Sequence, residues 1–503
     1  MMVAWLAQTM LFAAMKPTAE VLAQYQTVIG LEIHIQLQTQ TKVFASESMS
    51  FGEDPNSSVS AVTYAHPGTL PNPNLACIDQ MLRLGLALGC EINPYSYFDR
   101  KNYFYPDLPK GYQVTQDQAP LCLKGTVEVP MPDGSSFSVH LDRIHLEEDA
   151  GKSIHDQDPH YTLVDLNRAG TGLAEMVTNP DLRSPEQAGA MLSEVRRIVR
   201  YLGVSDANME RGNLRCDANV SVMLKDATEY GTRVEVKNLN SINFLQRAIQ
   251  YEVERQVGLI ESGGRVQQQT RLWDARQQKT YAMRDKETAQ DYRYFPEPDM
   301  LPIVVSEEKK EEIRVSLPEL PVSRFHQYVD KMGIGVNEAM TLIEDLPFAT
   351  YFEQLADRVG EGKVAANWLL GPVRTYLNEH DIEVSDYPVT QENLAKLIAL
   401  VSGDKVSFTV ARDQLLPACL EAPQADPNIL AEKMGLLAGT DQDELLVAMQ
   451  QLMERMPDEV KRYRQGKKNL AGFFVGQMMK EFKGKADPKA VNRVVRQELE
   501  KDS

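Results

Sequence analysis

Three short segments of the chain alternate charged or polar side chains with aliphatic ones. They cover residues 30–37, 215–222 and 233–238, and in the first of them Glu32 and His34 lie between leucine and isoleucine residues. Because successive side chains of a β-strand point to opposite faces, each segment places an apolar row on one face and its charged groups on the other. The alternation therefore predicts a sheet with one buried face and one face that carries carboxylates and cations.

The charged face offers the oxygen and nitrogen ligands of a metal ion. Glu32 and His34 are two residues apart, so both can reach one ion, and nearby segments add the carboxylates of Glu147, Glu148 and Glu175. In a regular strand Glu147 and Glu148 point to opposite faces, so both can serve one site only at a bulge or a strand end. Carboxylates with a single imidazole suit Mg²⁺ or Mn²⁺ better than Zn²⁺. Each acid taken alone is more often a surface charge, so the inference depends on their joint occurrence.

Two loops rich in charge and aromatic rings could add contacts to a nucleotide. The run 99–113 contains Lys101 and Lys110 beside four aromatic residues, and the run 283–299 contains Arg293. Lysine and arginine bind phosphate through charge-assisted hydrogen bonds, and aromatic rings can stack on bases. A packed loop of the same composition is the alternative for both runs.

The elements that must position these residues belong to a chain too long for one core. With 503 residues, several domains are expected. We predict an α+β protein with a large mixed α/β cradle domain at 26–302, whose floor is the β-sheet. A helical domain follows at 303–425 and a small all-α tail domain at 426–503. The Pro- and Ala-rich passage 416–427 is typical of a linker between the last two domains.

Apolar residues at helical spacing predict helices inside the cradle domain. The pattern covers residues 81–88, 185–202 and 241–262, and Ser241 is a suitable N-terminal cap for the third. After Pro302, charged and leucine-rich segments with the same period dominate. The cradle is therefore expected to mix strands and helices, while the rest of the chain is helical.

The last part of the chain is positively charged, although the protein as a whole is negatively charged. The protein carries a net charge of -18, yet eleven Lys and Arg residues face only two acids between Lys461 and Arg496, a local charge of +9. A cationic face on a small helical domain is typical of a surface that binds a phosphate backbone. A solvated lysine-rich helix is the alternative. The cations that we expect to bind nucleic acid are Lys467, Lys468, Lys480, Lys483 and Lys485.

Composition excludes several other classes of protein. The mean hydropathy of -0.35 is too low for a bundle of membrane helices, and the five cysteines are scattered without a Cys-x-x-Cys pair. Such cysteines suit a reducing cytoplasm and do not favour a disulfide framework. The first fifteen residues are apolar without Lys or Arg, which fits neither a secretory signal nor a spanning helix. A start at Met15 is the simpler interpretation, and no contact with a membrane is expected.

Familiar phosphate-binding and hydrolytic motifs are missing. The chain has no GxxxxGK[ST] loop, no GxGxxG fingerprint and no cysteine or serine in a plausible nucleophile setting. The residues therefore indicate metal and phosphate chemistry without a hydrolytic nucleophile.

Several motifs in the same order resemble the B subunits of the aspartyl/glutamyl-tRNA amidotransferases. The resemblance extends from about Val28 to the C-terminus. Its motifs are HLEEDAGK at 145–152, the run 99–113, DLNRAG at 165–170, the run 291–299, GFFVGQ at 472–477 and KGKADP at 483–488.

The resemblance implies an activity, its cofactors and its partners. Members use ATP and Mg²⁺ to phosphorylate the side-chain carboxylate of glutamate or aspartate mischarged on tRNA(Gln) or tRNA(Asn), and ammonia then displaces the phosphate. An amidase subunit supplies the ammonia from glutamine, and a small third subunit makes up the heterotrimer. By resemblance, Glu32, His34, Glu147, Glu148 and Glu175 hold the metal. Catalytic roles are assigned to Glu148, Asp217 and Lys237, and nucleotide contacts to Lys101, Lys110 and Arg293.

The chain departs from the family pattern at two places. Many members carry a Cys-x-x-Cys before the Pro-Gly pair that is Pro67-Gly68 here, so a zinc site is not carried over. The family has Pro-Leu where this chain has Gly172-Leu173, which makes Glu175 the least secure ligand. Two other functions stay open, a non-catalytic tRNA-binding scaffold and a free-standing carboxylate–amine ligase. The choice between Glu-tRNA(Gln) and Asp-tRNA(Asn) is also open.

Overall fold

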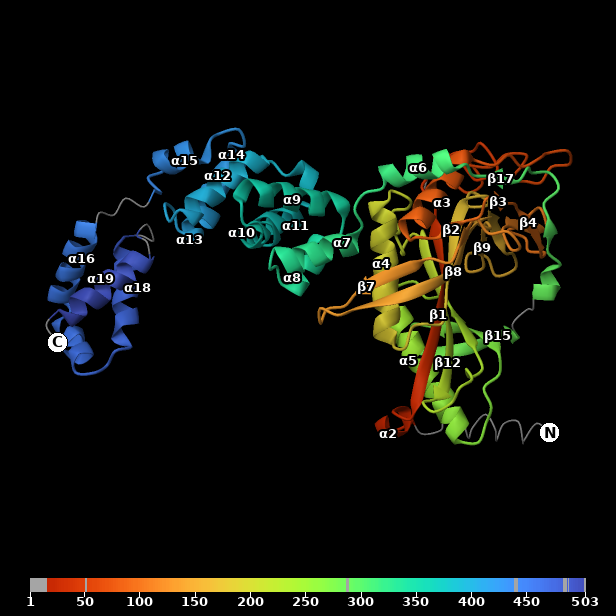
Figure 1. Cartoon of the computed structure of the whole chain (residues 1–503), viewed down its shortest axis with the longest axis horizontal. Coiled ribbons are helices and arrows are strands. Elements are labelled where there is room, and N and C mark those ends of the chain that lie inside the picture. The colour runs from red at the N-terminus through yellow and green to blue at the C-terminus, as the bar shows by residue number, and fades with distance from the viewer. Residues whose placement is uncertain are drawn as a thin grey trace. The chain divides into compact units, whose positions relative to one another are not determined.

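The structure is a computed structural model of the whole chain. It describes residues 16–49, 52–285, 289–437, 442–482, 486 and 488–501. The apolar stretch before Lys16 lies outside these residues. The chain divides into two compact units, 1–324 and 325–503, and each is described by itself (Figure 1).

A ten-stranded, mostly antiparallel sheet organises the first unit. Its strands run in the order β15-β14-β13-β12-β1-β11-β8-β6-β2, with β7 paired to β8 beside this path. The strands are β1 (Tyr25–Gln36), β2 (Glu91–Ile92), β6 (Cys122–Leu123), β7 (Thr126–Pro130), β8 (Ser136–Glu148), β11 (Gly172–Thr178), β12 (Leu214–Leu224), β13 (Val234–Lys237), β14 (Gln269–Asp274) and β15 (Lys279–Asp285). The three segments with alternating side chains thus become strands β1, β12 and β13, as predicted, and the structure places them next to one another in the sheet.

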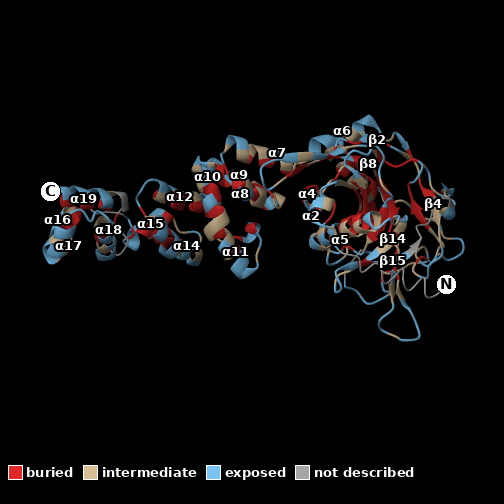
Figure 2. Cartoon of the chain, turned by 90° about the horizontal axis from the view of Figure 1, so that it is seen from below, coloured by how far each residue is buried: buried red, intermediate tan, exposed pale blue. Residues whose placement is uncertain are grey.

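Two long helices cover the apolar face of this sheet. They are α4 (Pro185–Tyr201), capped by the Ser184 side chain, and α5 (Ile242–Glu261), whose Phe244 amide donates to the Ser241 hydroxyl. Their apolar residues join those of β1 and β12 in one core that contains Ile33, fully buried. Figure 2 shows this burial along the strands and the inner faces of the helices. Because one face is sealed by helices, the polar face is left for chemistry.

Short elements complete the first unit. The three-stranded sheet β16-β4-β5 brings the two aromatic loops predicted to contact a nucleotide side by side. Helix α6 packs on α3, where the Lys309 ammonium lies 3.1 Å from the Asp79 carboxylate. The elements are α2 (Ala19–Leu22), α3 (Leu75–Ala87), β3 (Tyr95–Ser96), β4 (Asp99–Asn102), β5 (Tyr112–Thr115), β9 (Lys152–Ile154), β10 (Leu163–Asp165), η1 (Ala289–Tyr292), β16 (Phe295–Pro296), β17 (Ile303–Val304) and α6 (Glu307–Ser316).

The described part of the second unit is helical and contains two separate apolar cores. One core involves residues 325–436 and the other residues 445–499. The helices are α7 (Pro321–His326), η2 (Gln327–Lys331), α8 (Val336–Leu342), α9 (Leu346–Val359), α10 (Gly362–Trp368), η3 (Leu369–Val373), α11 (Arg374–His380), η4 (Val384–Asp386), α12 (Gln391–Ser402), α13 (Phe408–Val410), η5 (Ala411–Leu415), α14 (Leu416–Glu421), α15 (Pro427–Lys433), α16 (Gln442–Arg455), α17 (Pro457–Arg464), α18 (Leu470–Glu481) and α19 (Pro488–Glu500). Among the described residues, no helix is long and apolar enough to cross a membrane.

The passage 416–427 is not a linker. It forms α14 and the start of α15, and Leu416, Cys419 and Pro427 are buried. Pro427 is accepted at the first position of α15, because the amide that it lacks has no partner there, whereas Pro417 lies where the helical segment η5 continues into α14. Pro and Ala therefore mark helix starts and close packing here, rather than a flexible connection.

Candidate active site

The antiparallel register aligns the polar side chains of four strands, β1, β8, β11 and β12. His34 on β1 pairs with Glu175 on β11, which in turn pairs with His145 on β8. On the other side of β1, Glu32 pairs with Asp217 of β12. Directly paired side chains on one face lie about 5 Å apart. Residues far apart in the sequence thus meet on the polar face around the middle of β1.

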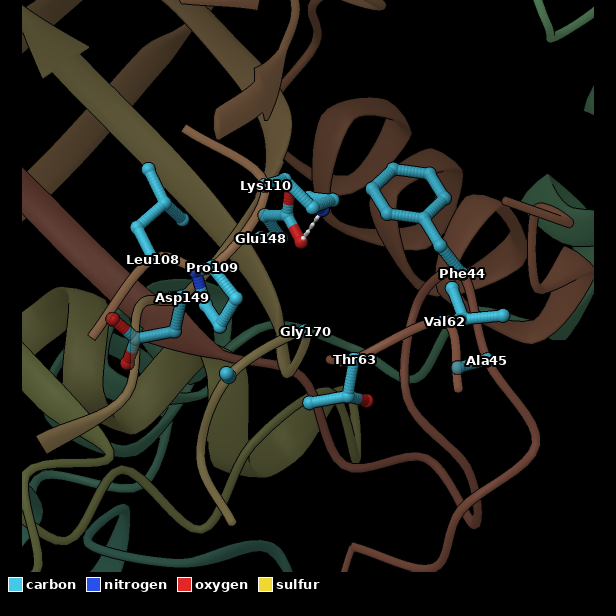
Figure 3. A pocket seen from close by; sticks show the side chains of 11 residues that line it. Phe44, Ala45, Val62, Thr63, Leu108, Pro109, Lys110, Glu148, Asp149 and Gly170 are labelled. Atoms are coloured by element: carbon cyan, nitrogen blue, oxygen red, sulfur yellow. Dashed lines mark hydrogen bonds and ion pairs between the residues drawn. The ribbon is translucent and has the colours of Figure 1, made fainter. Parts of the chain in front are cut away.

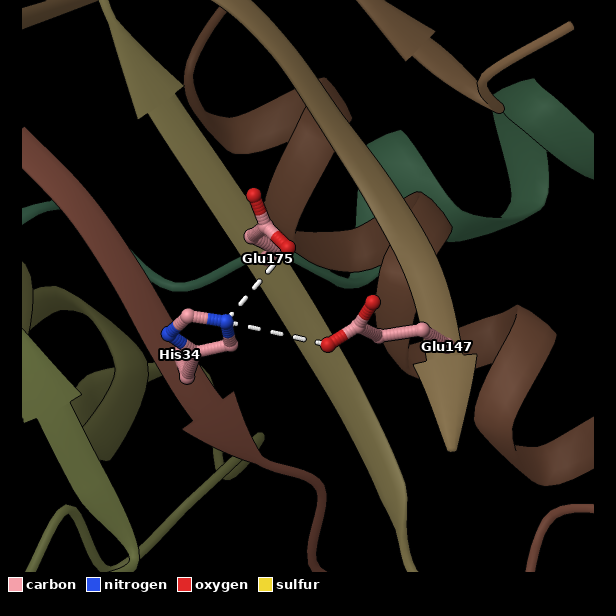
Figure 4. A group of neighbouring side chains, drawn as sticks. All are labelled: His34, Glu147 and Glu175. Carbon is pink, nitrogen blue, oxygen red and sulfur yellow. Dashed lines mark ion pairs between the residues drawn. The ribbon is translucent and has the colours of Figure 1, made fainter. Parts of the chain in front are cut away.

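The first cluster consists of His34, Glu147 and Glu175. The His34 Nε2 atom lies 3.4 Å from Glu175 Oε2 and 3.7 Å from Glu147 Oε1, and Figure 4 shows both carboxylates directed toward the ring. The His145 Nε2 atom lies 3.5 Å from Glu175 and 3.7 Å from Glu147. The Thr115 hydroxyl donates to Glu147 at 3.3 Å. Two imidazoles and two carboxylates therefore contact one another at this cluster.

Electrostatics in this cluster favour a positive charge between the carboxylates. Burial opposes charging of the His34 ring, but Glu175 and Glu147 outweigh it and raise the pKa of His34 to about 9. Burial also disfavours the charged form of Glu175, yet the neighbouring His145 and His34 hold its pKa well below the usual range. The two shifts are reciprocal, because the imidazole cation and the carboxylate anion each stabilise the charged form of the other.

The second cluster consists of Glu32, Asp217 and Glu235. The Lys237 ammonium lies between two of them, 2.5 Å from Asp217 and 3.4 Å from Glu235. Burial opposes its charge, but these two carboxylates raise the pKa of Lys237 above its ordinary value. The Asn219 amide donates to Glu32 Oε1 at 2.8 Å. This cluster carries its own cation.

Both clusters have donor atoms that fit a divalent metal ion. In each, one ligand atom per residue lies within 4.8 Å of the others, and among the described residues these are the two groups of at least three such ligands. Carboxylate oxygens with one imidazole nitrogen suit Mg²⁺ or Mn²⁺. The first cluster fits the predicted ligands His34, Glu147 and Glu175, while Glu32 lies in the second.

A polar pocket of about 180 Å³ opens beside the first cluster. Lys101 and Tyr294 line it together with Glu32, Glu147 and Glu175. An ammonium beside a carboxylate cluster can bind phosphate oxygens while metal ligands face the same space. Lys101, which we expect to contact the nucleotide, thus lines the pocket beside the first cluster.

Comparison with known proteins identifies the family. Residues 27–311 match the model described as the GatB/GatE catalytic domain, and residues 350–499 match the GatB domain. A protein of Synechococcus elongatus is 43% identical over 96% of this chain and 100% of its own length. Proteins of Pelagibacter ubique and Chlorobium phaeobacteroides are 43% and 45% identical, over 95% of this chain and 97% and 99% of their own lengths. All three are named as the B subunit of an aspartyl/glutamyl-tRNA(Asn/Gln) amidotransferase.

The chain belongs to this family of amidotransferase B subunits. The matches confirm the resemblance drawn from the sequence motifs, and they cover both the strand-rich and the helical parts of the chain. The first cluster lies on strands β1, β8 and β11, all inside the region that matches the catalytic domain.

Glu148 lies away from both clusters. It follows Glu147 at the end of a regular strand, so its side chain points to the opposite face and accepts from the Lys110 ammonium and, at 2.8 Å, from the Val114 amide. Figure 3 shows Lys110 reaching Glu148 in a small pocket that Phe44 also lines. Lys110, predicted to contact the nucleotide, therefore pairs with Glu148, predicted to bind the metal. Both lie apart from the other predicted metal ligands.

The remaining predicted residues are spread over the molecule. Arg293 is exposed, and its Nε donates to the Asp291 carbonyl at 3.3 Å. Lys467, Lys468 and Lys480 are exposed in the tail, where the Lys468 ammonium lies 4.4 Å from the centre of the Tyr463 ring. Lys483 and Lys485 lie outside the described residues.

Sequence reasoning missed His145 as a site residue. It lies two positions before Glu147 on the same strand face, the same spacing that singled out Glu32 and His34. The signal was therefore present in the chain. Arg215 was also missed, and its guanidinium donates to Asp149 at 2.8 Å, beside the site.

The structure shows the local contacts at the two places where the sequence departs from the family pattern. Ahead of Pro67-Gly68, the Thr63 hydroxyl donates to Glu47, and the Lys42 ammonium donates to the Ser58 carbonyl at 2.8 Å. Gly172 opens β11 in register with Glu148, so the backbone that leads to Glu175 is held inside the sheet.

Proposed function

We propose that this protein is the subunit of a tRNA-dependent amidotransferase that activates and amidates the aminoacyl group. The substrate is a glutamate or aspartate mischarged on tRNA(Gln) or tRNA(Asn), and the activating nucleotide is ATP. The observation that carries the proposal is the cluster of His34, Glu147 and Glu175 beside the Lys101 pocket, in a chain of this family. The described residues that line it include no serine or cysteine nucleophile, in keeping with ammonia made elsewhere.

The proposed reaction has two steps. The side-chain carboxylate of the aminoacyl group attacks the γ-phosphorus of ATP, and ADP leaves to give an acyl phosphate. Ammonia then attacks the acyl carbon, phosphate leaves and a proton is lost, which yields the amide. Phosphoryl transfer depends mainly on positioning and on offsetting charge.

Residues of the two clusters and of the adjoining pocket contribute to binding and to charge stabilisation in different ways. His34, Glu147 and Glu175 would hold Mg²⁺, which when bound supplies positive charge against the transferring phosphoryl group. Lys101 adds an ammonium on the same side of the pocket. Lys237, held between Asp217 and Glu235, keeps a fixed positive charge beside the second cluster. These cations favour the approach of two negatively charged substrates.

The partners and location follow from the same chemistry. We propose that ammonia comes from an amidase subunit, which forms a heterotrimer with this chain and a small third subunit. The three cores are proposed to correspond to cradle, helical and tail domains, with Lys467, Lys468, Lys480, Lys483 and Lys485 of the tail contacting tRNA. A cytoplasmic location fits five buried cysteines that form no disulfide.

Reconstitution tests the proposal. The full chain is combined with the amidase, the small third subunit, each mischarged tRNA, ATP, Mg²⁺ and glutamine, and the amidated aminoacyl-tRNA is measured. We expect amide formation with one or both tRNAs, and none without ATP. A scaffold would bind tRNA but retain full transamidation after His34→Ala. A free-standing ligase would amidate the free amino acid without tRNA.

A further inference from the structure

Four tyrosines form a continuous chain of ring contacts in the first unit. The ring centres are 5.8 Å apart for Tyr105 and Tyr103, 6.2 Å for Tyr103 and Tyr292, and 6.0 Å for Tyr292 and Tyr294. We call this set the tyrosine ladder. All three contacts are edge-to-face, the arrangement that stabilises aromatic pairs.

The ladder is built from two loops that are fixed to each other. Strand pairing brings Phe295 opposite Arg100, and the Asn102 amide donates to the carbonyls of Tyr292 and Arg293 at 3.1 and 2.9 Å. Arg293 has a positive φ of 47°, which is costly for a residue with a side chain and persists only where surroundings impose it. The positions of Tyr292 and Tyr294 are therefore set before any ligand binds.

The first loop is ordered by its own backbone. The Tyr103 amide donates to the Gly111 carbonyl at 3.2 Å, and the Leu108 amide donates to the Tyr105 carbonyl at 3.0 Å. The Phe104 ring lies so close to Gly111 that a Cβ there would be 2.9 Å from it, and Gly111 also has a positive φ of 74°. The positive φ therefore favours glycine at this position.

The two ends of the ladder have different surroundings. Tyr294 lines the pocket with Glu147 and Glu175, and burial together with nearby carboxylates raises its pKa above the ordinary value. At the other end Tyr105 is 50% exposed and its neighbour Phe104 is 80% exposed. The ladder thus connects exposed rings with the carboxylate cluster.

We propose that the tyrosine ladder binds the unpaired 3′ end of the charged tRNA, with a terminal base stacked at its exposed end. This inference rests on the proposed function, because the aminoacyl carboxylate at the tip of that strand must reach the first cluster. Proteins commonly bind single-stranded nucleic acid by stacking its bases on aromatic rings and pairing its phosphates with cations. Here the Lys101 ammonium lies 4.8 Å from the centre of the Tyr292 ring and can meet a backbone phosphate.

Steady-state kinetics of the reconstituted enzyme test the proposal. Replacing Tyr105 by alanine removes a stacking surface, so the KM for charged tRNA should rise about tenfold while the KM for ATP stays unchanged. Tyr105→Trp keeps a planar ring and should restore a KM close to that of the unaltered protein. Tyr230→Ala, which removes an exposed tyrosine outside the ladder, is the matched control. A rise in the KM for ATP would show instead that the adenine of ATP stacks there, and no change in either KM would leave the ladder a packing feature; both overturn the proposal.

A spectroscopic readout separates stacking from general damage. A tRNA whose 3′-terminal adenosine is replaced by 2-aminopurine should lose fluorescence on binding, because stacking quenches that base. The quenching should be weaker with Tyr105→Ala and retained with Tyr105→Trp and Tyr230→Ala. Equal quenching by all variants overturns the proposal. If the unaltered protein forms no amide with either tRNA, the proposed function itself fails, which is a different outcome.

Discussion

Two carboxylate clusters lie next to each other on one sheet, but the structure neutralises them differently. In the first, imidazole rings of His34 and His145 face Glu147 and Glu175 at 3.4 to 3.7 Å. In the second, the Lys237 ammonium is already 2.5 Å from Asp217. The neighbouring carboxylates raise the pKa of His34, but its ring can release the proton and offer a nitrogen to a metal ion, whereas an ammonium has no lone pair to offer. Similar acids therefore form a site that can take up a metal ion in the first cluster, whereas in the second cluster the counter-ion is a fixed side chain of the protein.

The largest effect is expected from Glu147→Gln. The amide keeps the size of the side chain but removes a negative ligand from the first cluster. ATP-dependent amidation should fall by about 10³-fold, since several kcal/mol of charge stabilisation are lost. Amide formation by the reconstituted enzyme measures the effect, and Glu128→Gln on β7 is the control. Activity close to that of the unaltered protein would remove the first cluster from the mechanism.

The carboxylate of Glu252, outside both clusters, is paired entirely with side chains of the protein. Glu252 is completely buried, and Arg255 and Arg271 lie 2.8 and 3.1 Å from it. Glu252→Gln should lower the free energy of unfolding by about 3 kcal/mol, because it leaves two partly buried arginines without a counter-charge. Urea unfolding of the first unit measures this loss. Glu254→Gln, a partly exposed acid on the same helix, should change stability by less than about 1 kcal/mol.

The same carboxylate predicts a pH dependence. Burial acts to raise its pKa, but Arg255, Thr280 and Arg271 together keep the pKa of Glu252 below its ordinary 4.5. The unfolded chain therefore binds more protons near this pH, so the stabilisation is fully present above pH 4.5 and is lost as the pH falls through the folded-state value. Glu252→Gln should lack this part of the acid sensitivity. An unchanged pH profile of unfolding would contradict the pairing.

Lys237→Met tests whether the ammonium of Lys237 is what prevents the second cluster from binding a divalent ion. Without the ammonium, Asp217 and Glu235 lose their counter-charge, and we expect amidation to fall by about 10- to 100-fold. The freed cluster should also bind a divalent ion, so Mn²⁺ titration should reveal one additional site. Lys237→Arg keeps the charge and should add no site. If Lys237→Met binds no more Mn²⁺ than the unaltered protein, the difference between the clusters has another cause.

The smallest effect is expected from Asn219→Ala. This change removes the hydrogen bond to Glu32 but leaves every charge in place. A hydrogen bond to a charged group contributes roughly 1.5 kcal/mol, so kcat/KM should fall about tenfold or less. The pH profile of kcat should be unchanged. A loss as large as that of Glu147→Gln would mean that Asn219 contacts a reacting group.

Local patterns predicted much of the fold and some of the site. Alternation identified β1, β12 and β13, and helical spacing identified α4 and α5, the second of them with its Ser241 cap. The strand period also predicted that Glu147 and Glu148 point to opposite faces. These features depend on neighbours within a few residues. The linker prediction at 416–427 was wrong because proline and alanine are used there at helix starts inside a core.

Pairings between distant residues were beyond such patterns. Lys110 was predicted to contact phosphate, yet its ammonium pairs with Glu148, 38 residues away. Lys237 and Asp217 meet only because β13 lies beside β12. Contacts of this kind depend on which strands become neighbours, and the periodicity of a single strand contains no information about that.

The sequence by itself identified several of the donors and the family. Alternation placed carboxylates, the His34 imidazole and cations on one face, and ordered motifs identified the family of amidotransferase B subunits. Only the tertiary structure decided which of these side chains belongs to the first cluster and which to the second. The order β12-β1-β11-β8 sends Glu32 and His34, two residues apart on β1, to different clusters. The physical reason is that each side chain meets whatever the adjacent strand places opposite it, His34 finding glutamates and Glu32 finding acids already paired with lysine.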